Sequence, residues 1–380
     1  MAKQAYVYSG TDWVPLASEV TNLSGYQTKA LNQFPYRNLL INGDMQVAQR
    51  GTSTASITSG SNYVVDRWKF QVNTQGTWTM SQETDAPTGS GFRNSTKVLC
   101  TTADASPASG DYVLLNQTLE GQNLQVIKKG TAAAEQLTLS FWVKSNVTGT
   151  YIVELRDQDN TRQVSKSYTI SASATWEKKT ITFPADTTGT LDNDNNLSLF
   201  PIWWLGAGSN FTSGTLATTW ASGTDANKAV GQTNLASAIN NYWQITGVQL
   251  EIGDTATPFE FKSAEDELEE CARYYYRFTA AAAYTCFTLS GISYQSTGAV
   301  ATFPLATPMR TEPSAVEYAN IGVQDNLLGG VNSVSAASLD SPHRLNPQVA
   351  FTSSGLTATR PARIMANNNS SAYIGFSAEL

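Results

Sequence analysis

Charged residues are scarce in this chain of 380 residues. They make up 14% of it, where about a quarter is usual for a soluble domain. The formal net charge is −7, and no stripe of Lys and Arg is present. Nucleic-acid binders neutralise phosphates with such stripes, so the composition argues against nucleic acid as a partner. Few charges together with many Thr, Tyr, Trp and Val residues are typical of all-β proteins.

Histidine and cysteine are nearly absent. His343 is the only histidine and lies between two prolines, without a nucleophile motif nearby, which argues against a nucleophile activated by histidine. The three cysteines, Cys100, Cys271 and Cys286, cannot all pair within one chain and form no CxxC motif. We expect free, buried thiols, as in a protein assembled in a reducing cytoplasm, and no zinc site.

Long apolar runs are missing as well. No segment reaches the ~20 apolar residues of a membrane-spanning helix, and residues 1–20 lack the apolar centre of a signal peptide. The sequence therefore predicts neither membrane insertion nor a secretion signal.

Alternating apolar and polar residues indicate strands through most of the chain. Four strands are expected at 137–144, 151–156, 164–170 and 176–183, with polar turns between them. In the second of these, Glu154 alternates with Val153 and Leu155 and is expected in solvent. Short strands at this spacing predict a sandwich or a barrel, and no strand–helix–strand unit is present. A small hairpin is expected within residues 5–14.

One helix is expected, over residues 263–278. Ser263 and Asp266 form a capping box, and acidic residues favour the positive helix N-terminus. We expect Tyr275 in a domain junction and Tyr274 and Tyr276 partly exposed. Helical spacing selects a buried face that consists of Leu268, Cys271, Ala272 and Tyr275.

Two sets of sequence blocks bracket the main β region. The first is RNLLINGDM (37–45), QRGT (49–52) and DRW (66–68), and the second is QLEIGDTATPFE (249–260) and CARYYYRF (271–278). Together they resemble a family of bacteriophage tail-fibre and minor virion proteins, in which they bracket a jelly-roll sandwich similar to carbohydrate-binding modules. FPL (303–305), PMR (308–310) and the ending YIGFSAEL (373–380) are similar to the same family.

The resemblance implies a mainly β fold. A jelly-roll β-sandwich would be followed by a short helix and a smaller C-terminal β-sandwich domain, after a short N-terminal attachment segment. The expected regions are a virion-attachment segment (1–36), the sandwich (37–262), a linker helix (263–281) and a C-terminal β-rich domain that forms the host-binding tip (282–380).

The resemblance also implies a function. The chain would be a tail fibre, a non-enzymatic virion protein assembled in the host cytoplasm, and most fibres of this kind are homotrimers. Its partners would be other tail or virion proteins at the N-terminus and host surface polysaccharide at the distal β domains. A polysaccharide depolymerase tailspike and a capsid decoration or fibre-adaptor protein stay open as alternatives. The candidate attachment residues are Tyr6, Tyr8, Trp13 and Leu23, although a loosely packed arm is also open.

Three tryptophans are candidate sugar platforms, because an aromatic face matches the apolar face of a pyranose. Trp142 faces away from the expected core. Trp204 lies in a strand with two apolar faces, where core packing is the alternative, and Trp220 lies further along the chain. A subunit contact is the alternative for Trp142.

Asp192, Asp194 and Asn196 cluster oxygen ligands of the kind that calcium takes. The segment lacks the Gly and terminal Glu of an EF-hand loop, and a solvated loop is the alternative. Because jelly-roll modules often carry a structural calcium, the resemblance favours one here, with no other cofactor. Four carboxylates are candidates for a catalytic pair, and none is expected to act: Glu154, Asp157, Asp159 and Glu177.

Overall fold

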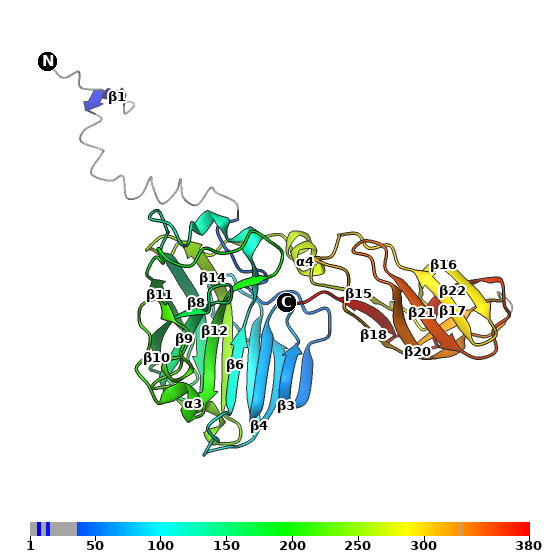
Figure 1. The fold of residues 1–380 in the computed structure, drawn as a ribbon, viewed down its shortest axis with the longest axis horizontal. Coiled ribbons are helices and arrows are strands. Elements are labelled where there is room, and N and C mark those ends of the chain that lie inside the picture. Colours follow the sequence, from blue (N-terminus) through cyan, green and yellow to red (C-terminus); the bar gives the residue numbers. More distant parts are fainter. Residues whose placement is uncertain (1–5, 9–12, 16–35, 327–328) are drawn as a thin grey trace.

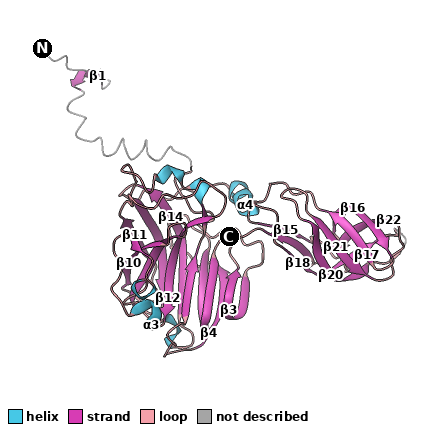
Figure 2. Ribbon diagram, in the orientation of Figure 1, coloured by secondary structure: helices cyan, strands magenta, loops and turns pink. Residues whose placement is uncertain are grey.

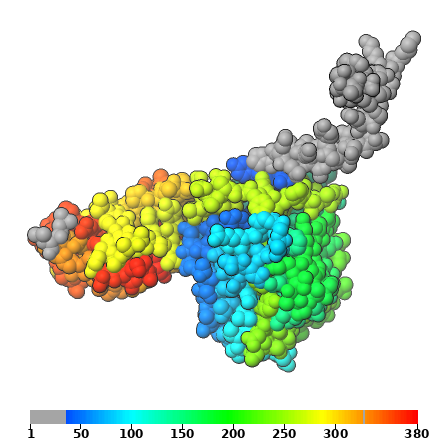
Figure 3. All heavy atoms as spheres, turned by 180° about the vertical axis from the view of Figure 1, so that it is seen from behind, coloured from blue at the N-terminus to red at the C-terminus, as the bar shows by residue number. Residues whose placement is uncertain are grey.

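The computed structural model describes residues 6–8, 13–15, 36–326 and 329–380. The fold is mainly β, as predicted, and consists of two β bodies with one short helix, α4, between them (Figures 1 and 2). The space-filling view from behind shows the C-terminal body projecting from one end of the larger body (Figure 3). No helix among the described residues is long and apolar enough to span a bilayer.

The predicted N-terminal hairpin is present. Strand β1 (Tyr6–Tyr8) pairs antiparallel with β2 (Trp13–Pro15). Only the backbone is described for Tyr6, Tyr8 and Trp13, and Leu23 lies outside the described residues. Attachment through these four residues therefore stays a prediction.

The larger body is a β-sandwich. Its strands are joined in the order β11-β8-β14-β5-β4-β6-β12-β9-β10-β13, with β3 paired to β4 and β7 paired to β12. The bounds match the four strands expected from the sequence to within a few residues. The strands are β3 (Ser53–Tyr63), β4 (Lys69–Glu83), β5 (Ser95–Thr102), β6 (Tyr112–Asn116), β7 (Leu119–Glu120), β8 (Leu137–Ser145), β9 (Gly149–Asp157), β10 (Arg162–Ile170), β11 (Glu177–Phe183), β12 (Leu197–Ala207), β13 (Ala221–Ser222) and β14 (Tyr242–Ile252).

The sheet divides into two layers at β4. The first half of this strand, 69–74, pairs with β6, and the second half, 77–83, pairs with β5. Gly76 lies between the halves with φ +76°, and a Cβ there would come within 2.6 Å of the Thr102 carbonyl oxygen, so only glycine fits. The core between the layers contains Trp68 and Trp203, whose ring centroids are 5.6 Å apart.

A further segment covers the outer face of the layer that contains β9 and β12. This cover segment, residues 208–232, includes the helix α3 (Ser209–Thr212) and places Phe211 against Trp204, with ring centroids 5.2 Å apart. The prediction that Glu154 is solvated is therefore wrong. Its side chain is fully buried and accepts a hydrogen bond of 3.0 Å from Nε1 of Trp204.

The helix is shorter than predicted. The hydroxyl of Ser263 accepts from the Asp266 N–H as expected, but α4 spans Ala264–Ala272 and is followed by β15 (Tyr275–Thr279). The chain leaves the helix because Tyr275–Thr279 pairs with the distant strand β23 (Tyr373–Ser377). The buried residues of α4 are Glu267, Cys271 and Ala272, so the prediction that Leu268 is buried is wrong.

The smaller body is β-rich as predicted, but six of its strands close into a barrel where two facing sheets were expected. The barrel order is β16-β17-β21-β20-β19-β22, and β15, β23 and β18 form a three-stranded sheet beside it. A barrel leaves no free sheet edge. The strands are β16 (Cys286–Gln295), β17 (Gly298–Thr302), β18 (Ala315–Ala319), β19 (Ile321–Gln324), β20 (Asn332–Ser341), β21 (Gln348–Ser353) and β22 (Arg360–Ala366).

Candidate functional site

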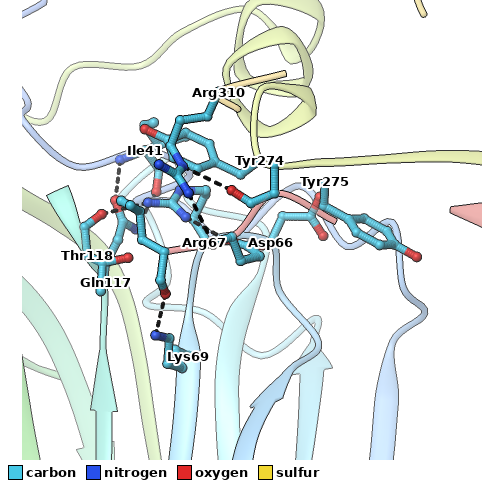
Figure 4. Close-up of polar contacts among 12 residues, drawn as sticks. Ile41, Asp66, Arg67, Lys69, Gln117, Thr118, Tyr274, Tyr275 and Arg310 are labelled. Atoms are coloured by element: carbon cyan, nitrogen blue, oxygen red, sulfur yellow. Dashed lines mark hydrogen bonds and ion pairs between the residues drawn. The ribbon is translucent and has the colours of Figure 1, made fainter. Parts of the chain in front are cut away.

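The two β bodies meet at a polar junction. We define the junction as the contact of α4, β15, Arg310 and the last residues, 378–380, with the loops and strand ends of the sandwich (Figure 4). Some of its residues lie far apart in the sequence. Arg67 and Glu379, for example, are 312 positions apart.

Arg67 lies at the centre of the junction and is almost fully buried, with 1% of its surface exposed. Its Nη1 donates to a carboxylate oxygen of Glu379 at 2.5 Å, and its Nη2 donates to the carbonyl oxygen of Thr118 at 2.6 Å. The guanidinium lies 3.4 Å from the centroid of the Tyr274 ring. Burial disfavours the charge of Arg67 and is the largest single effect, but Glu379, Tyr274 and Tyr63 together outweigh it and raise the pKa of Arg67.

A second ion pair joins the end of α4 to strand β7. Arg273 donates from Nε and Nη2 to the two carboxylate oxygens of Glu120, at 2.9 and 2.7 Å, and the Tyr274 hydroxyl also donates to Glu120. Although burial disfavours the charge of Glu120, the hydrogen bonds from Arg273 and Tyr274 lower its pKa. Two charge-assisted bonds in parallel fix the orientation of the helix end against the sandwich.

Arg310 connects the smaller body to the loop of the sandwich that contains Asp192, Asp194 and Asn196, which we call the acidic loop. Its Nη1 donates to the Asn195 carbonyl oxygen at 2.6 Å, and the Asn195 side chain donates to the Arg310 carbonyl oxygen at 3.0 Å. Its Nε donates to the carbonyl oxygen of Ala378 at 3.0 Å. The same guanidinium therefore contacts the sandwich and the chain end.

Tyr275 belongs to the junction as predicted. It is fully buried, its hydroxyl donates to Glu317 at 2.9 Å, and the guanidinium of Arg50 lies 3.4 Å from its ring centroid. The side-chain amide of Gln49 donates to the Tyr275 carbonyl oxygen at 2.7 Å. Tyr274 was expected to be partly exposed, and this prediction is wrong because only 1% of its surface is exposed.

Two buried carboxylic acids where α4 meets the sandwich have raised pKa values. Burial raises the pKa of Asp66 to about 6 and that of Glu267 to about 7. Asp66 accepts from the side-chain amide of Gln49 at 2.6 Å, and Glu267 accepts from the backbone N–H of Asn42. We therefore expect the contact of α4 with the sandwich to depend on pH near neutrality.

The sequence blocks that resemble the virion family converge on the junction. DRW supplies Asp66 and Arg67, QRGT supplies Gln49 and Arg50, and the later blocks supply the tyrosines of β15, Arg310 and Glu379. No sequence pattern pointed to their partners Glu120, Asn195 and Glu317, because each contact depends on the folded arrangement of distant segments. The blocks therefore carry the connection between the two bodies.

The three candidate sugar tryptophans do not form one site. Trp142 is half-buried on the outer face of β8, beside Lys178 and Thr246 of the neighbouring strands. Trp204 is only 3% exposed and lies under the cover segment, so the core interpretation of its strand is confirmed, and its neighbour Trp203 lies in the main core. Trp142 and Trp204 therefore lie on opposite outer faces of the sandwich.

Trp220 packs on a buried lysine. Its Nε1 donates to the Pro184 carbonyl oxygen at 2.8 Å, and the ammonium of Lys129 lies 4.9 Å from its ring centroid. Lys129 pairs with Asp157 and with Asp186, the latter at 3.0 Å. The ring thus covers an ion-pair cluster, which is a structural role.

The acidic loop has contacts of its own. The backbone N–H of Asp192 donates to Asp159, and Asp194 accepts from the backbone and side chain of Asn196 at 2.9 and 2.6 Å. Among the described residues, no group of three or more His, Cys, Asp or Glu side chains is arranged to hold a metal ion. A structural calcium therefore stays a prediction.

The other candidate groups lie apart from one another. Asp157 is buried against Lys129, and Glu177 accepts from two backbone N–H groups at the end of β10. His343 is exposed and accepts from two backbone N–H groups of its own loop. All three cysteines are free, and two are buried as predicted, whereas Cys286 is exposed.

A cavity of about 700 Å³ opens beside α4. Two exposed aromatic rings line it, Tyr36 and Phe261, with exposed fractions of 77% and 51%. The carboxylates of Asp266 and Glu269 and the guanidinium of Arg344 complete its polar wall. Aromatic rings beside polar groups can bind a sugar, and sequence reasoning missed this combination because its residues come from three separate segments.

No protein-family model and no curated protein matches this chain. Solved structures that it resembles include the enzymatically active domain of tailspike protein 4 of bacteriophage CBA120, with 16% identity and a TM-score of 0.31 over 58% of this chain and 22% of that one. TmCBM61 in complex with β-1,4-galactotriose follows, with 10% identity and a TM-score of 0.29 over 57% of this chain and 99% of the other. The family 11 carbohydrate-binding module from Clostridium thermocellum, in complex with a β-1,3-1,4-mixed-linked tetrasaccharide, has 11% identity and a TM-score of 0.28 over 55% and 98%.

Proposed function

We propose that this chain is a non-enzymatic structural protein of a bacteriophage particle, a tail fibre that is attached through residues 1–36 and holds its C-terminal barrel toward the host surface. Host surface polysaccharide is the partner of its distal β domains, and the fibre is a homotrimer.

The observation that carries the proposal is the junction. Buried ion pairs, of which Arg67 with Glu379 is the most buried, fix the barrel at one end of the sandwich. A buried pair is costly to break because it leaves an uncompensated charge, so the two bodies behave as one elongated unit. Such a unit transmits position and force along a fibre, and the blocks that build it are those that resemble the virion family.

The non-enzymatic part of the proposal is supported by the placement of two carboxylates. Glu154 is buried under the cover segment and hydrogen-bonded to Trp204, and Asp157 is buried against Lys129. A glycosidase needs its carboxyl pair on either side of an accessible sugar. Both side chains have structural partners instead.

The cavity beside α4 supports a polysaccharide partner. Phe261 offers an exposed ring, and Asp266 and Arg344 offer a hydrogen-bond acceptor and donors beside it. We expect Phe261→Ala to weaken binding of host polysaccharide by about 5-fold, since one stacked ring contributes on the order of 1 kcal/mol. The matched control is Tyr284→Ala, which removes an exposed ring from the barrel.

Electron microscopy of purified particles labelled with an antibody against the barrel tests the proposal. Label at the ends of tail fibres is the expected result. Label spread over the capsid, or particles without label, would overturn it. In parallel, the purified chain is incubated with host polysaccharide, and we expect binding without release of new reducing ends, so sustained release would contradict the non-enzymatic role.

A further inference from the structure

A second cavity, of about 430 Å³, lies between α4 and strand β15. Leu268 of the helix lines it together with Tyr276 and Phe278 of the strand. The rings of Tyr276 and Phe278 are half-buried, and their centroids lie 5.2 Å apart. Leu268 is 45% exposed and belongs to the core cluster of neither body. The cavity therefore combines apolar side chains with access from solvent, as a ligand site does.

The second cavity adjoins the cavity that contains Phe261. Glu269 of α4 and Thr307 of the loop after β17 line both cavities. Phe261 lines only the first cavity, and Tyr276 lines only the second. The two cavities therefore form one groove between α4 and residues 306–308, with an aromatic ring on each side of Glu269. We call it the α4 groove.

Five charged side chains of the α4 groove form no ion pair within the part of the chain that the structure describes. Three are the carboxylates of Glu265, Asp266 and Glu269, and two are the guanidiniums of Arg277 and Arg344. Carboxylates accept hydrogen bonds and guanidiniums donate them. A sugar hydroxyl both donates and accepts, so it finds partners of each kind along the groove.

The remaining charged side chains of the groove are held by partners. Lys262 donates to both carboxylate oxygens of Glu270, at 2.9 and 2.7 Å, and Arg273 is paired with Glu120. Glu260 accepts from a backbone N–H of the sandwich at 2.8 Å. With these pairs counted, acidic side chains outnumber basic ones at the groove, so an acidic polysaccharide meets more repulsion than attraction.

We propose that the α4 groove binds several consecutive sugars of an uncharged polysaccharide chain. Phe261 and Tyr276 each stack on the apolar face of a sugar, and Glu269 between them accepts hydrogen bonds from hydroxyl groups. The inference rests on the proposed function, because the first cavity is the one proposed to bind host polysaccharide. It adds the class of ligand and the need for a chain, since the two rings line different cavities.

Isothermal titration calorimetry of the full chain tests the length of the site. The probes are oligosaccharides of two to eight sugars, prepared from host polysaccharide by partial acid hydrolysis. We expect the affinity of the wild type to rise with length by at least about 10-fold, since the second ring and the hydrogen bonds of Glu269 add to the first ring. Tyr276→Ala should remove most of this gain and weaken binding of the longest oligosaccharide by about 5-fold.

Two further variants accompany Tyr276→Ala. Leu268→Ala should weaken binding of the longest oligosaccharide by about 3-fold, because it removes apolar surface from the groove. It decides if Tyr276→Ala loses the far-ultraviolet circular dichroism of the folded chain, since Leu268 lies outside both cores. The matched control is Tyr284→Ala, which removes a ring that is 56% exposed and lies outside the groove.

Chemical oxidation of the longest oligosaccharide tests the class of ligand. Converting its primary hydroxyl groups to carboxylates should weaken binding by at least about 5-fold, because like charges are brought together in the groove. Glu269→Gln removes one of these charges and should recover part of the loss.

Four results would overturn the inference and leave the proposed function intact. They are equal affinity at all lengths, unchanged binding in a folded Tyr276→Ala, an equal loss in Tyr284→Ala, and equal binding of the oxidised oligosaccharide. If no oligosaccharide of any length binds, host polysaccharide fails as the partner in the proposed function, and the groove fails with it.

Discussion

The sandwich and the barrel bury their side chains in different ways. The sandwich core contains four fully buried tryptophans, Trp68, Trp78, Trp203 and Trp243, and the cover segment closes one of its outer faces. The buried core of the smaller body contains no tryptophan among its described residues, and seven of its 18 buried residues are alanines, such as Ala299 and Ala301. A large aromatic side chain buries far more apolar surface than an alanine.

We expect the two bodies to depend on the junction to different degrees. The sandwich buries more large aromatic side chains than the smaller body. The smaller body should therefore lose more stability than the sandwich when the junction is weakened. The sequence blocks that resemble the virion family supply the residues of this junction.

The largest expected effect is in the sandwich core. Trp203→Ala should lower the free energy of unfolding of the sandwich by about 3–5 kcal/mol, since it removes a buried aromatic ring and leaves a cavity. Trp142→Ala is the matched control on the half-buried outer face, where a smaller loss is expected. Urea denaturation followed by far-ultraviolet circular dichroism measures both, and equal losses would contradict the assignment of Trp203 to the core.

The second largest effect is expected at the junction, where loss of an ion pair should weaken the barrel more than the sandwich. Glu379→Gln leaves Arg67 buried without its counter-ion, and we expect a loss of about 3 kcal/mol in the free energy that holds the junction together. Differential scanning calorimetry should show a separate transition for the barrel at lower temperature. The control is Glu135→Gln, which breaks an exposed pair with Lys128 and should cost less than about 0.5 kcal/mol. A single unchanged transition in Glu379→Gln would show that the pair contributes little.

The sequence predicted local features well. The strands between 137 and 183, the hairpin backbone and the Ser263 cap all follow from patterns within a few residues. The errors come from distant contacts: Glu154 is buried by residues 208–232, and β15 replaces the last turn of the helix because it pairs with β23. The partners in the junction could not be predicted for the same reason.

The third effect is a pH dependence of the junction. The folded-state pKa of Glu267 is about 7, above the ordinary value of 4.5, and that of Asp66 is about 6. A raised pKa means that the fold favours the protonated acid, so this contribution is complete below about pH 4 and is lost as the pH rises through 6 and 7. The barrel transition should therefore move to lower temperature between pH 5 and pH 8.

Glu267→Gln identifies the group responsible. The amide oxygen can still accept from the Asn42 N–H but cannot ionise, so the variant should gain on the order of 2 kcal/mol relative to wild type at pH 8 and little at pH 5. Thermal melts of both proteins at the two pH values measure this difference. An identical pH dependence in the variant would exclude Glu267 as its source.

The smallest effect concerns the outer face of α4. Leu268 is 45% exposed, so Leu268→Ala should change the free energy of unfolding by less than about 0.5 kcal/mol. Cys271→Ser on the buried face should cost more, because it replaces a fully buried sulfur atom by a smaller and more polar hydroxyl. Thermal denaturation of the two variants compares the two faces of α4 directly. A larger loss of stability for Leu268→Ala than for Cys271→Ser would mean that Leu268 lies on the buried face, as the sequence predicted.

We expect the junction to join the two bodies into one rigid unit. Spin labels at Thr54→Cys on the sandwich and Ser335→Cys on the barrel, in a Cys286→Ser background and diluted with unlabelled chain, report the distance between the bodies by double electron–electron resonance. We predict one narrow distance distribution in the otherwise unchanged chain and a broad one after Glu379→Gln. A broad distribution with the junction intact would show that the two bodies move independently, which contradicts the account.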